Sequence, residues 1–129
     1  MISRHAGVLL WLSVASNSHA ASSYSAQYTN CIDRAGGVTA DTIDCIGQEL
    51  AHQDKRLNQN YQHLLNVLRP ERKTELRDVQ RLWLKYREAN CKFYYDTEGG
   101  SLARIIANQC MLDMLIERNQ ELERLIEQH

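Results

Sequence analysis

Apolar residues recur at helical spacing along most of the chain, and three helix-breaking points divide this pattern into four segments. The breaks are Gly36-Gly37, Arg69-Pro70 and Gly99-Gly100. The clearest stripe has spacings of three, four and seven residues and consists of Ile43, Ile46, Leu50, Leu57, Tyr61, Leu64 and Leu68. Because such spacing puts side chains on one face of a helix, it predicts a long amphipathic helix from Asp41 to Leu68.

Two more long helices are expected downstream. The first, over residues 70–95, begins at Pro70, which suits a first helical turn, and its apolar stripe should face the core. That stripe consists of Leu76, Val79, Trp83, Tyr86 and Phe93. The second, over residues 101–127, has Ser101 as its expected N-cap and a broad apolar face. Its members are Leu102, Ile105, Ile106, Leu112, Leu115, Ile116, Leu122, Leu125 and Ile126.

The segment over residues 22–35 has a weaker helical pattern, carried by Tyr24, Tyr28, Cys31 and Ile32. We expect this short helix to pack against the others only because Cys31 holds it. The chain has no alternating strand pattern and no repeat. The predicted fold is therefore all-α: an elongated antiparallel bundle of three long helices, each about 35 to 40 Å long, plus a short N-terminal helix.

Each of the two glycine pairs lies between two cysteines. Cys31 and Cys45 flank Gly36-Gly37, whereas Cys91 and Cys110 flank Gly99-Gly100. Four cysteines allow three pairings, and we favour the one in which each disulfide closes one antiparallel hairpin. Each disulfide would stabilise the fold by roughly 3 kcal/mol by restricting the unfolded chain. Disulfides persist outside the cytosol, so the cysteines indicate an exported protein.

Residues 1–20 predict export independently, because they have the parts of a signal peptide. Arg4 and His5 form a short basic start, residues 6–15 are mostly apolar, and Ser18-His19-Ala20 offers a cleavage site between small residues. We expect the mature protein to be one domain over residues 21–129, periplasmic or secreted. The apolar stretch is too short to cross a bilayer and no cysteine follows the cleavage point directly, so we expect no membrane anchor.

Charge and reactive residues narrow the function further. Removing the one basic residue of the leader leaves 15 − 1 = 14 basic against 16 acidic residues, a net charge of −2 that does not attract nucleic acid or lipid. His52 and His63 would lie about 16 Å apart on one helix, too far to share a metal ion. No nucleophile–base pattern and no phosphate-binding loop occurs, so we predict neither enzymatic activity nor a cofactor. The basic stripe of Arg77, Arg81 and Lys85 is expected to be solvated or ion-paired, although it would also suit an anionic partner.

One ordered set of residues resembles a known family. The set is Leu57-Asn58 with Tyr61, then Gln80-Arg81, Trp83, Tyr86-Arg87 and Cys91, followed by Gly99-Gly100-Ser101 and Cys110. It is similar to the pattern of the LprI-type lysozyme inhibitors, small exported bacterial proteins, and the resemblance extends from Cys31 to the last helix. The resemblance implies an all-helical, disulfide-linked domain that blocks lysozyme or a related wall-cleaving enzyme by binding to it, and that is not itself an enzyme.

The loop around the second glycine pair is the candidate binding surface, since a hairpin tip closed by a disulfide is rigid and protruding. It comprises Asp96, Glu98, Gly99, Gly100 and Ser101. Its two carboxylates would suit the cationic surface of many lysozymes. A Leu-Asn-x-x-Tyr motif and a Gln-Arg-x-Trp-x-x-Tyr-Arg motif are expected to be structural instead.

The structural motif residues are Leu57, Asn58, Tyr61, Gln80, Trp83, Tyr86 and Arg87. Trp83 and Tyr86 should fill the core. Asn58 should hydrogen-bond to a neighbouring helix, and Arg87 should reach a carboxylate or the loop near Cys91.

Two other functions remain open at this point. The domain would also suit a binding or immunity module for another envelope protein without any action on lysozyme, or a purely structural role. Stoichiometric binding to a wall hydrolase distinguishes the first function from these two, and a specific envelope partner distinguishes the module from the structural role.

Overall fold

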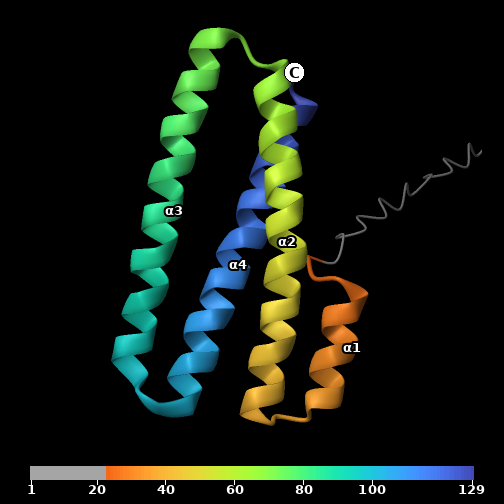
Figure 1. Cartoon of the computed structure of the whole chain (residues 1–129), viewed down its shortest axis with the longest axis vertical. Helices are drawn as coiled ribbons and strands as arrows, with labels where there is room; N and C mark the ends of the chain where they lie inside the picture. The colour runs from red at the N-terminus through yellow and green to blue at the C-terminus, as the bar shows by residue number, and fades with distance from the viewer. Residues whose placement is uncertain (1–22) are drawn as a thin grey trace, which may run out of the picture.

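The computed structural model describes residues 23–129, except for the side chains of residues 96–98, and the regular structure in that range is helical (Figure 1). The helices are α1 (Ala26–Ala35), α2 (Thr39–Val67), α3 (Pro70–Glu98) and α4 (Gly100–Glu127). The predicted all-α fold, with three long helices and a short first one, is confirmed. The predicted signal peptide, residues 1–20, lies outside the described residues. Within residues 23–129, no helix is both long and apolar enough to span a membrane.

Helix α4 is the centre of the arrangement, because it packs against α2 and also against α3 (Figure 1). Helix α1 packs against α2. Each helix runs antiparallel to the next, so the molecule is elongated along the helix axes (Figure 1). The α2–α3 turn lies at one end, near the C-terminus, and both glycine turns lie at the opposite end.

The apolar core lies mainly between α2 and α4. Its fully or nearly buried members include Ile46, Leu57, Leu64 and Leu65 from α2 and Leu112, Leu115, Ile116 and Leu122 from α4. Every member of the stripe predicted for α2 is buried or half-buried, so that prediction is confirmed. The predicted face of α4 is also confirmed except at Leu102, which is 59% exposed. Removing these side chains from water is the main force that holds α2 and α4 together.

The apolar stripe predicted for α3 is only partly correct. Leu76 is buried and Trp83 is half-buried, but Val79, Tyr86 and Phe93 are 48%, 61% and 68% exposed. The expectation that Tyr86 fills the core is therefore wrong. Much of the apolar surface of α3 lies on the outside of the molecule.

The face of α3 that packs inward is mixed in polarity instead. It consists of Leu76, Gln80, Trp83, Arg87 and Cys91, all of which are buried or half-buried. Cys91 is bonded to Cys110 of α4, and this covalent link sets the rotation of α3 about its own axis. At 100° per residue, Val79, Tyr86 and Phe93 lie roughly 140° around the helix from Cys91, so they cannot face α4 as well.

A row of polar residues crosses the α2–α4 interface beside the leucine core. Asn119, which is fully buried, donates through Nδ2 to the backbone oxygen and to Oε1 of Gln53, at 3.0 and 3.2 Å. Its Oδ1 accepts from Nδ2 of Asn60 at 3.3 Å. Nearby, Arg56 donates to both carboxylate oxygens of Glu123 at 2.7 Å. These directional bonds specify the register of α2 against α4 more sharply than apolar contacts do.

Helix α1 is attached by more than its disulfide, so the expectation that Cys31 alone holds it is wrong. Ser25 caps α1 by accepting from the amide of Tyr28 at 3.1 Å. The amide and hydroxyl of Ser25 also donate to the two carboxylate oxygens of Glu49 on α2. Burial acts to raise the pKa of Glu49, but hydrogen bonds from Ser25 and Gln53 outweigh it and hold that pKa below its ordinary value.

The Asn119→Ala variant should have a free energy of unfolding lower by about 2 to 4 kcal/mol, because it leaves a buried cavity and removes the partner of Gln53. Asn58→Ala is the matched control, since Asn58 is an exposed asparagine on α2. It should change the free energy of unfolding by less than about 0.5 kcal/mol. Urea denaturation followed by circular dichroism measures both. Equal losses in the two variants would mean that the polar row does not stabilise the interface.

The depressed pKa of Glu49 predicts a specific loss of stability in acid. Its contribution is present above the ordinary glutamate pKa and is lost as the pH falls through the lower, folded-state value, so the loss should occur below about pH 4. Glu49→Gln should be less stable than the natural protein at pH 7, and this difference should shrink as the pH is lowered and the carboxylate of Glu49 is protonated. Glu117→Gln, at an exposed position, is the control and should leave the pH profile unchanged. If the stability of Glu49→Gln and that of the natural protein changed with pH in the same way, Glu49 would not be the source of the acid sensitivity.

Candidate functional site

Both disulfides that the sequence predicts are present, and both lie towards the same end of the molecule. Cys31–Cys45 joins α1 to α2 with Cα atoms 5.7 Å apart, and Cys91–Cys110 joins α3 to α4 with Cα atoms 5.5 Å apart. Each closes a hairpin around a glycine turn, as Figure 1 shows for the course of the chain. We call the two turns and the residues beside them, 36–38 and 94–102, the disulfide end. In each hairpin, the disulfide limits how far the two helices can move apart.

The α3–α4 turn is shorter than the sequence suggests. Helix α3 continues to Glu98, so Asp96 and Glu98 belong to its last turn rather than to a loop, and their side chains lie outside the described part of the structure. Gly99 and Gly100 have φ angles of 65° and 68°, in the left-handed region that favours glycine. Gly99 is the N-cap of α4, so the expectation that Ser101 caps this helix is wrong.

The disulfide end exposes several large apolar side chains. Val38 is 53% exposed, Tyr94 43%, Tyr95 49% and Leu102 59%. Val38 follows the first glycine turn and the other three lie beside the second, whose Ser101 is also exposed. Exposed apolar and aromatic side chains that gather on one part of a small protein often mark a protein-binding surface.

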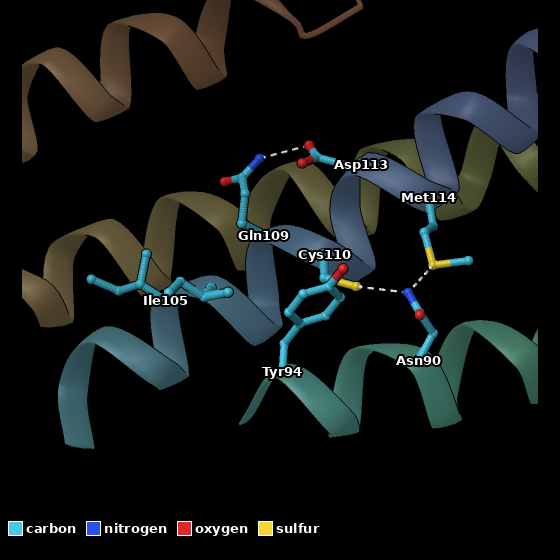
Figure 2. Close-up of a pocket in the computed structure, with 8 residues that line it drawn as sticks. Asn90, Tyr94, Ile105, Gln109, Cys110, Asp113 and Met114 are labelled. Carbon is cyan, nitrogen blue, oxygen red and sulfur yellow. Dashed lines mark hydrogen bonds between the residues drawn. The ribbon is translucent and has the colours of Figure 1, made fainter. Parts of the chain in front are cut away.

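An open pocket of about 410 Å³ lies between α3 and α4 beside this end (Figure 2). Its lining consists of Asn90, Tyr94, Ile105, Ile106, Gln109, Cys110, Asp113 and Met114. Asn90 of α3 donates to Sγ of Cys110 and to Sδ of Met114, at 3.6 and 3.4 Å, so the disulfide borders the pocket (Figure 2). The remaining lining is largely aliphatic and aromatic, which suits a partner's apolar side chain better than an ion.

The polar side of the pocket is fixed by residues that precede and begin α1. Asp113 accepts from Nε2 of Gln109 at 2.8 Å and from the hydroxyl of Tyr24. Oε1 of Gln109 accepts from the hydroxyl of Tyr28 at 2.9 Å. Burial, together with the neighbouring Asp113, raises the pKa of Tyr24, which keeps its hydroxyl a proton donor. Sequence reasoning missed this cluster; the spacing of Gln109 and Asp113 predicts their mutual contact, but nothing in it reveals the two tyrosines.

The Leu-Asn-x-x-Tyr motif of α2 lines a groove and does not only fill the core. Leu57, Asn58 and Tyr61 of α2 face Gln80 of α3 across a groove of about 360 Å³. Asp54, Arg77, Arg81 and Leu84 complete its lining. Asn58 is exposed and makes no side-chain hydrogen bond within the described residues, so its predicted bond to a neighbouring helix is wrong. Gln80 is buried and accepts from Nε of Arg118 at 3.0 Å.

Trp83 of the Gln-Arg-x-Trp-x-x-Tyr-Arg motif is in contact with two arginine side chains. The guanidinium carbon of Arg87 lies 4.9 Å from the centre of its ring, and that of Arg118 lies 5.9 Å from it. Nε and Nη1 of Arg87 are buried and have no hydrogen-bond partner among the described residues, so the predicted bridge to a carboxylate is wrong. Desolvation accordingly lowers the pKa of Arg87. The contact with Trp83 partly compensates for this desolvation.

The described residues bring together no group of three His, Cys, Asp or Glu side chains that would hold a metal ion. His52 and His63 are both exposed on α2. The fold and the site together define a small all-helical domain closed by two disulfides, with exposed apolar side chains at one end.

Comparison with known proteins places this domain in a family. The family model described as lysozyme inhibitor LprI matches residues 19–122, and the chain therefore belongs to the LprI family. The chain is also 26% identical over 98 residues to the uncharacterized protein R02472 of Rhizobium meliloti (strain 1021). That match covers 64% of this chain and 70% of the relative. No solved structure matches the chain.

Replacing Arg87 by methionine should raise the free energy of unfolding by about 1 kcal/mol, because the variant keeps the packing on Trp83 and removes two buried nitrogens without hydrogen bonds. Arg81→Met is the matched control on the same helix, because Arg81 is exposed. It should change the free energy of unfolding by less than about 0.5 kcal/mol. Chemical denaturation measures both variants. A clear loss of stability in the Arg87 variant would show that the guanidinium–indole contact outweighs the cost of burial.

Proposed function

We propose that this protein, exported and processed near Ala20, inhibits lysozyme or a related peptidoglycan-cleaving glycosidase by binding to it stoichiometrically. The observation that carries the proposal is the match of the LprI family model over residues 19–122. The two disulfides support it, since they suit a protein that works outside the cytosol. The proposal needs no catalytic group on this chain, because a bound inhibitor acts by occupying its target.

The disulfide end is the part of the molecule best suited to bind the enzyme. Binding orders side chains and loops at a cost of about 0.5 to 1.5 kcal/mol for each immobilised side chain, so a surface already held rigid loses less on association. The α3–α4 turn is such a surface, because helices enter and leave it directly and Cys91–Cys110 links them. Tyr95 and Leu102 beside it provide apolar contact area.

The pocket between α3 and α4 offers a second element of recognition. Interfaces owe much of their affinity to a few side chains that fill pockets at their centre. With a volume of about 410 Å³, the pocket has room for one large side chain of the enzyme. Tyr94 belongs both to the pocket lining and to the exposed surface of the disulfide end, so the two elements form one continuous site.

Electrostatics favour the same location. Asp96 and Glu98 are acidic residues in the last helical turn of α3, next to the glycine turn. A negative rim would attract the cationic surface of a lysozyme and speed the encounter, while the apolar residues supply the lasting contacts.

The experiment that tests the function is the lysis of purified bacterial cell walls, followed as turbidity loss, by lysozymes of several types. Each enzyme is titrated with the mature protein, residues 21–129, with both disulfides formed. Inhibition that saturates near one protein molecule per enzyme molecule supports the proposal. If no lysozyme type is inhibited, the proposed function is wrong. A pull-down from the cell envelope would then test whether the protein binds another envelope protein instead.

The binding surface is tested by Leu102→Glu, which puts a charge into the apolar part of the disulfide end. We expect the inhibition constant to rise at least about tenfold, because a buried unpaired charge opposes association. Leu84→Glu is the matched control, since Leu84 is 42% exposed and lies in the middle of α3. It should inhibit like the natural protein in the same turbidity assay. Equal inhibition by both variants would move the binding surface away from the disulfide end.

A further inference from the structure

The outer side of α3 carries an ordered apolar stripe that the single chain does not bury. It consists of Val79, Leu82, Tyr86, Ala89 and Phe93, and we call it the α3 seam. The exposed fractions of its four large members are 48%, 65%, 61% and 68% in chain order, and Ala89 is exposed as well. The spacings are three, four, three and four residues. This alternation is the a and d pattern with which two helices pack together in a coiled coil.

The seam is distinct from the face with which α3 packs inside its own chain. The inner face holds Trp83, Gln80 and Cys91, and the Cys91–Cys110 disulfide prevents α3 from turning to bury the seam against α4. Three of the large apolar side chains of the seam are more than 60% exposed along one helix, and monomeric proteins rarely expose large contiguous apolar patches. The seam therefore has the form of an interface between chains.

Charges along one edge of the seam indicate which partner fits. In chain order they are Asp78, Lys85 and Lys92, each of which directly precedes a member of the seam, and all three residues are exposed. A two-fold axis near Lys85 would bring Asp78 of each copy opposite Lys92 of the other, each seven residues from the axis. The axis thus creates two attractive contacts.

The one unfavourable contact is between Lys85 and its own counterpart on the axis. A parallel pair would lack the attractive contacts, since this charged edge would then face the opposite edge of the partner helix. That edge contains Leu76, Trp83 and Asn90, which are uncharged and packed inward. The charge pattern is therefore complementary to itself in the antiparallel orientation, as a symmetric homodimer requires.

We propose that two copies of this chain associate through their α3 seams in an antiparallel, two-fold symmetric dimer. Leu82 of each copy packs beside Tyr86 and Ala89 of the other. Because the axis crosses the middle of α3, the two disulfide ends point in opposite directions and each remains open to a partner. The dimer does not depend on the inhibitory role, and the two are tested separately.

The first test is sedimentation equilibrium of the mature protein, residues 21–129, with both disulfides formed. We expect a reversible dimer with a dissociation constant on the order of 10 µM, in keeping with a modest interface. Leu82→Glu should weaken the dimer at least about tenfold, because it places a charge in the seam. Leu84→Glu, on the same helix but outside the seam, is the matched control and should leave the dissociation constant unchanged. Circular dichroism checks that both variants fold.

The second test uses the charged edge and fixes the orientation. Asp78→Lys and Lys92→Asp should each weaken the dimer severalfold, and the double variant should restore it, because the exchange recreates both attractive contacts. Lys85→Gln should tighten the dimer by removing the repulsion on the axis. A protein that stays monomeric throughout the concentration range would overturn the proposal. So would a dimer that Leu82→Glu leaves intact, or single charge variants that the double variant does not rescue.

Discussion

The Cys91–Cys110 disulfide fixes the rotation of α3, and most other features of the molecule depend on that rotation. It turns Gln80 and Trp83 inward and leaves the apolar seam of α3 on the outside. It also borders the pocket between α3 and α4 and closes the glycine turn at the disulfide end. A helix held by apolar contacts alone would rotate to bury its most apolar face. The covalent bond prevents that rotation, so the apolar side of α3 stays exposed in the folded chain.

Helix α4 is held to α2 and to α3 by different kinds of interaction. Towards α2 it presents a leucine core and a row of hydrogen bonds centred on Asn119 and Gln53, which gives a specific register. Towards α3 it presents the disulfide, the buried Arg118 and the contact of Arg118 with Trp83. The first interface is stabilised mainly by burial and the second more by a covalent link. The covalent link adds stability to a domain whose core is of modest size.

Sequence patterns predicted the stripes of α2 and α4 well, because each of these helices has one apolar face and a packed neighbour to receive it. The position of one cysteine on each side of each glycine turn predicted both disulfides, because the two helices of a short hairpin lie side by side. The prediction for α3 was wrong at Tyr86, because this helix has two faces with helical spacing and periodicity does not say which is buried. Asn58 and Arg87 were misjudged because a hydrogen-bond partner on another helix depends on the distance between helices.

The sequence by itself determined the all-helical class, the four segments, the two hairpins and the resemblance to the LprI family, since these follow from local spacing and residue identity. Only the tertiary structure decided that α4 is central, that Tyr24 and Tyr28 contact Asp113 and Gln109, and that a pocket forms beside the disulfide. The two tyrosine contacts, for example, require residues more than 80 positions apart to meet, as Tyr28 and Gln109 do at a separation of 81. Their meeting depends on how the helices rotate and pack, which no local pattern encodes.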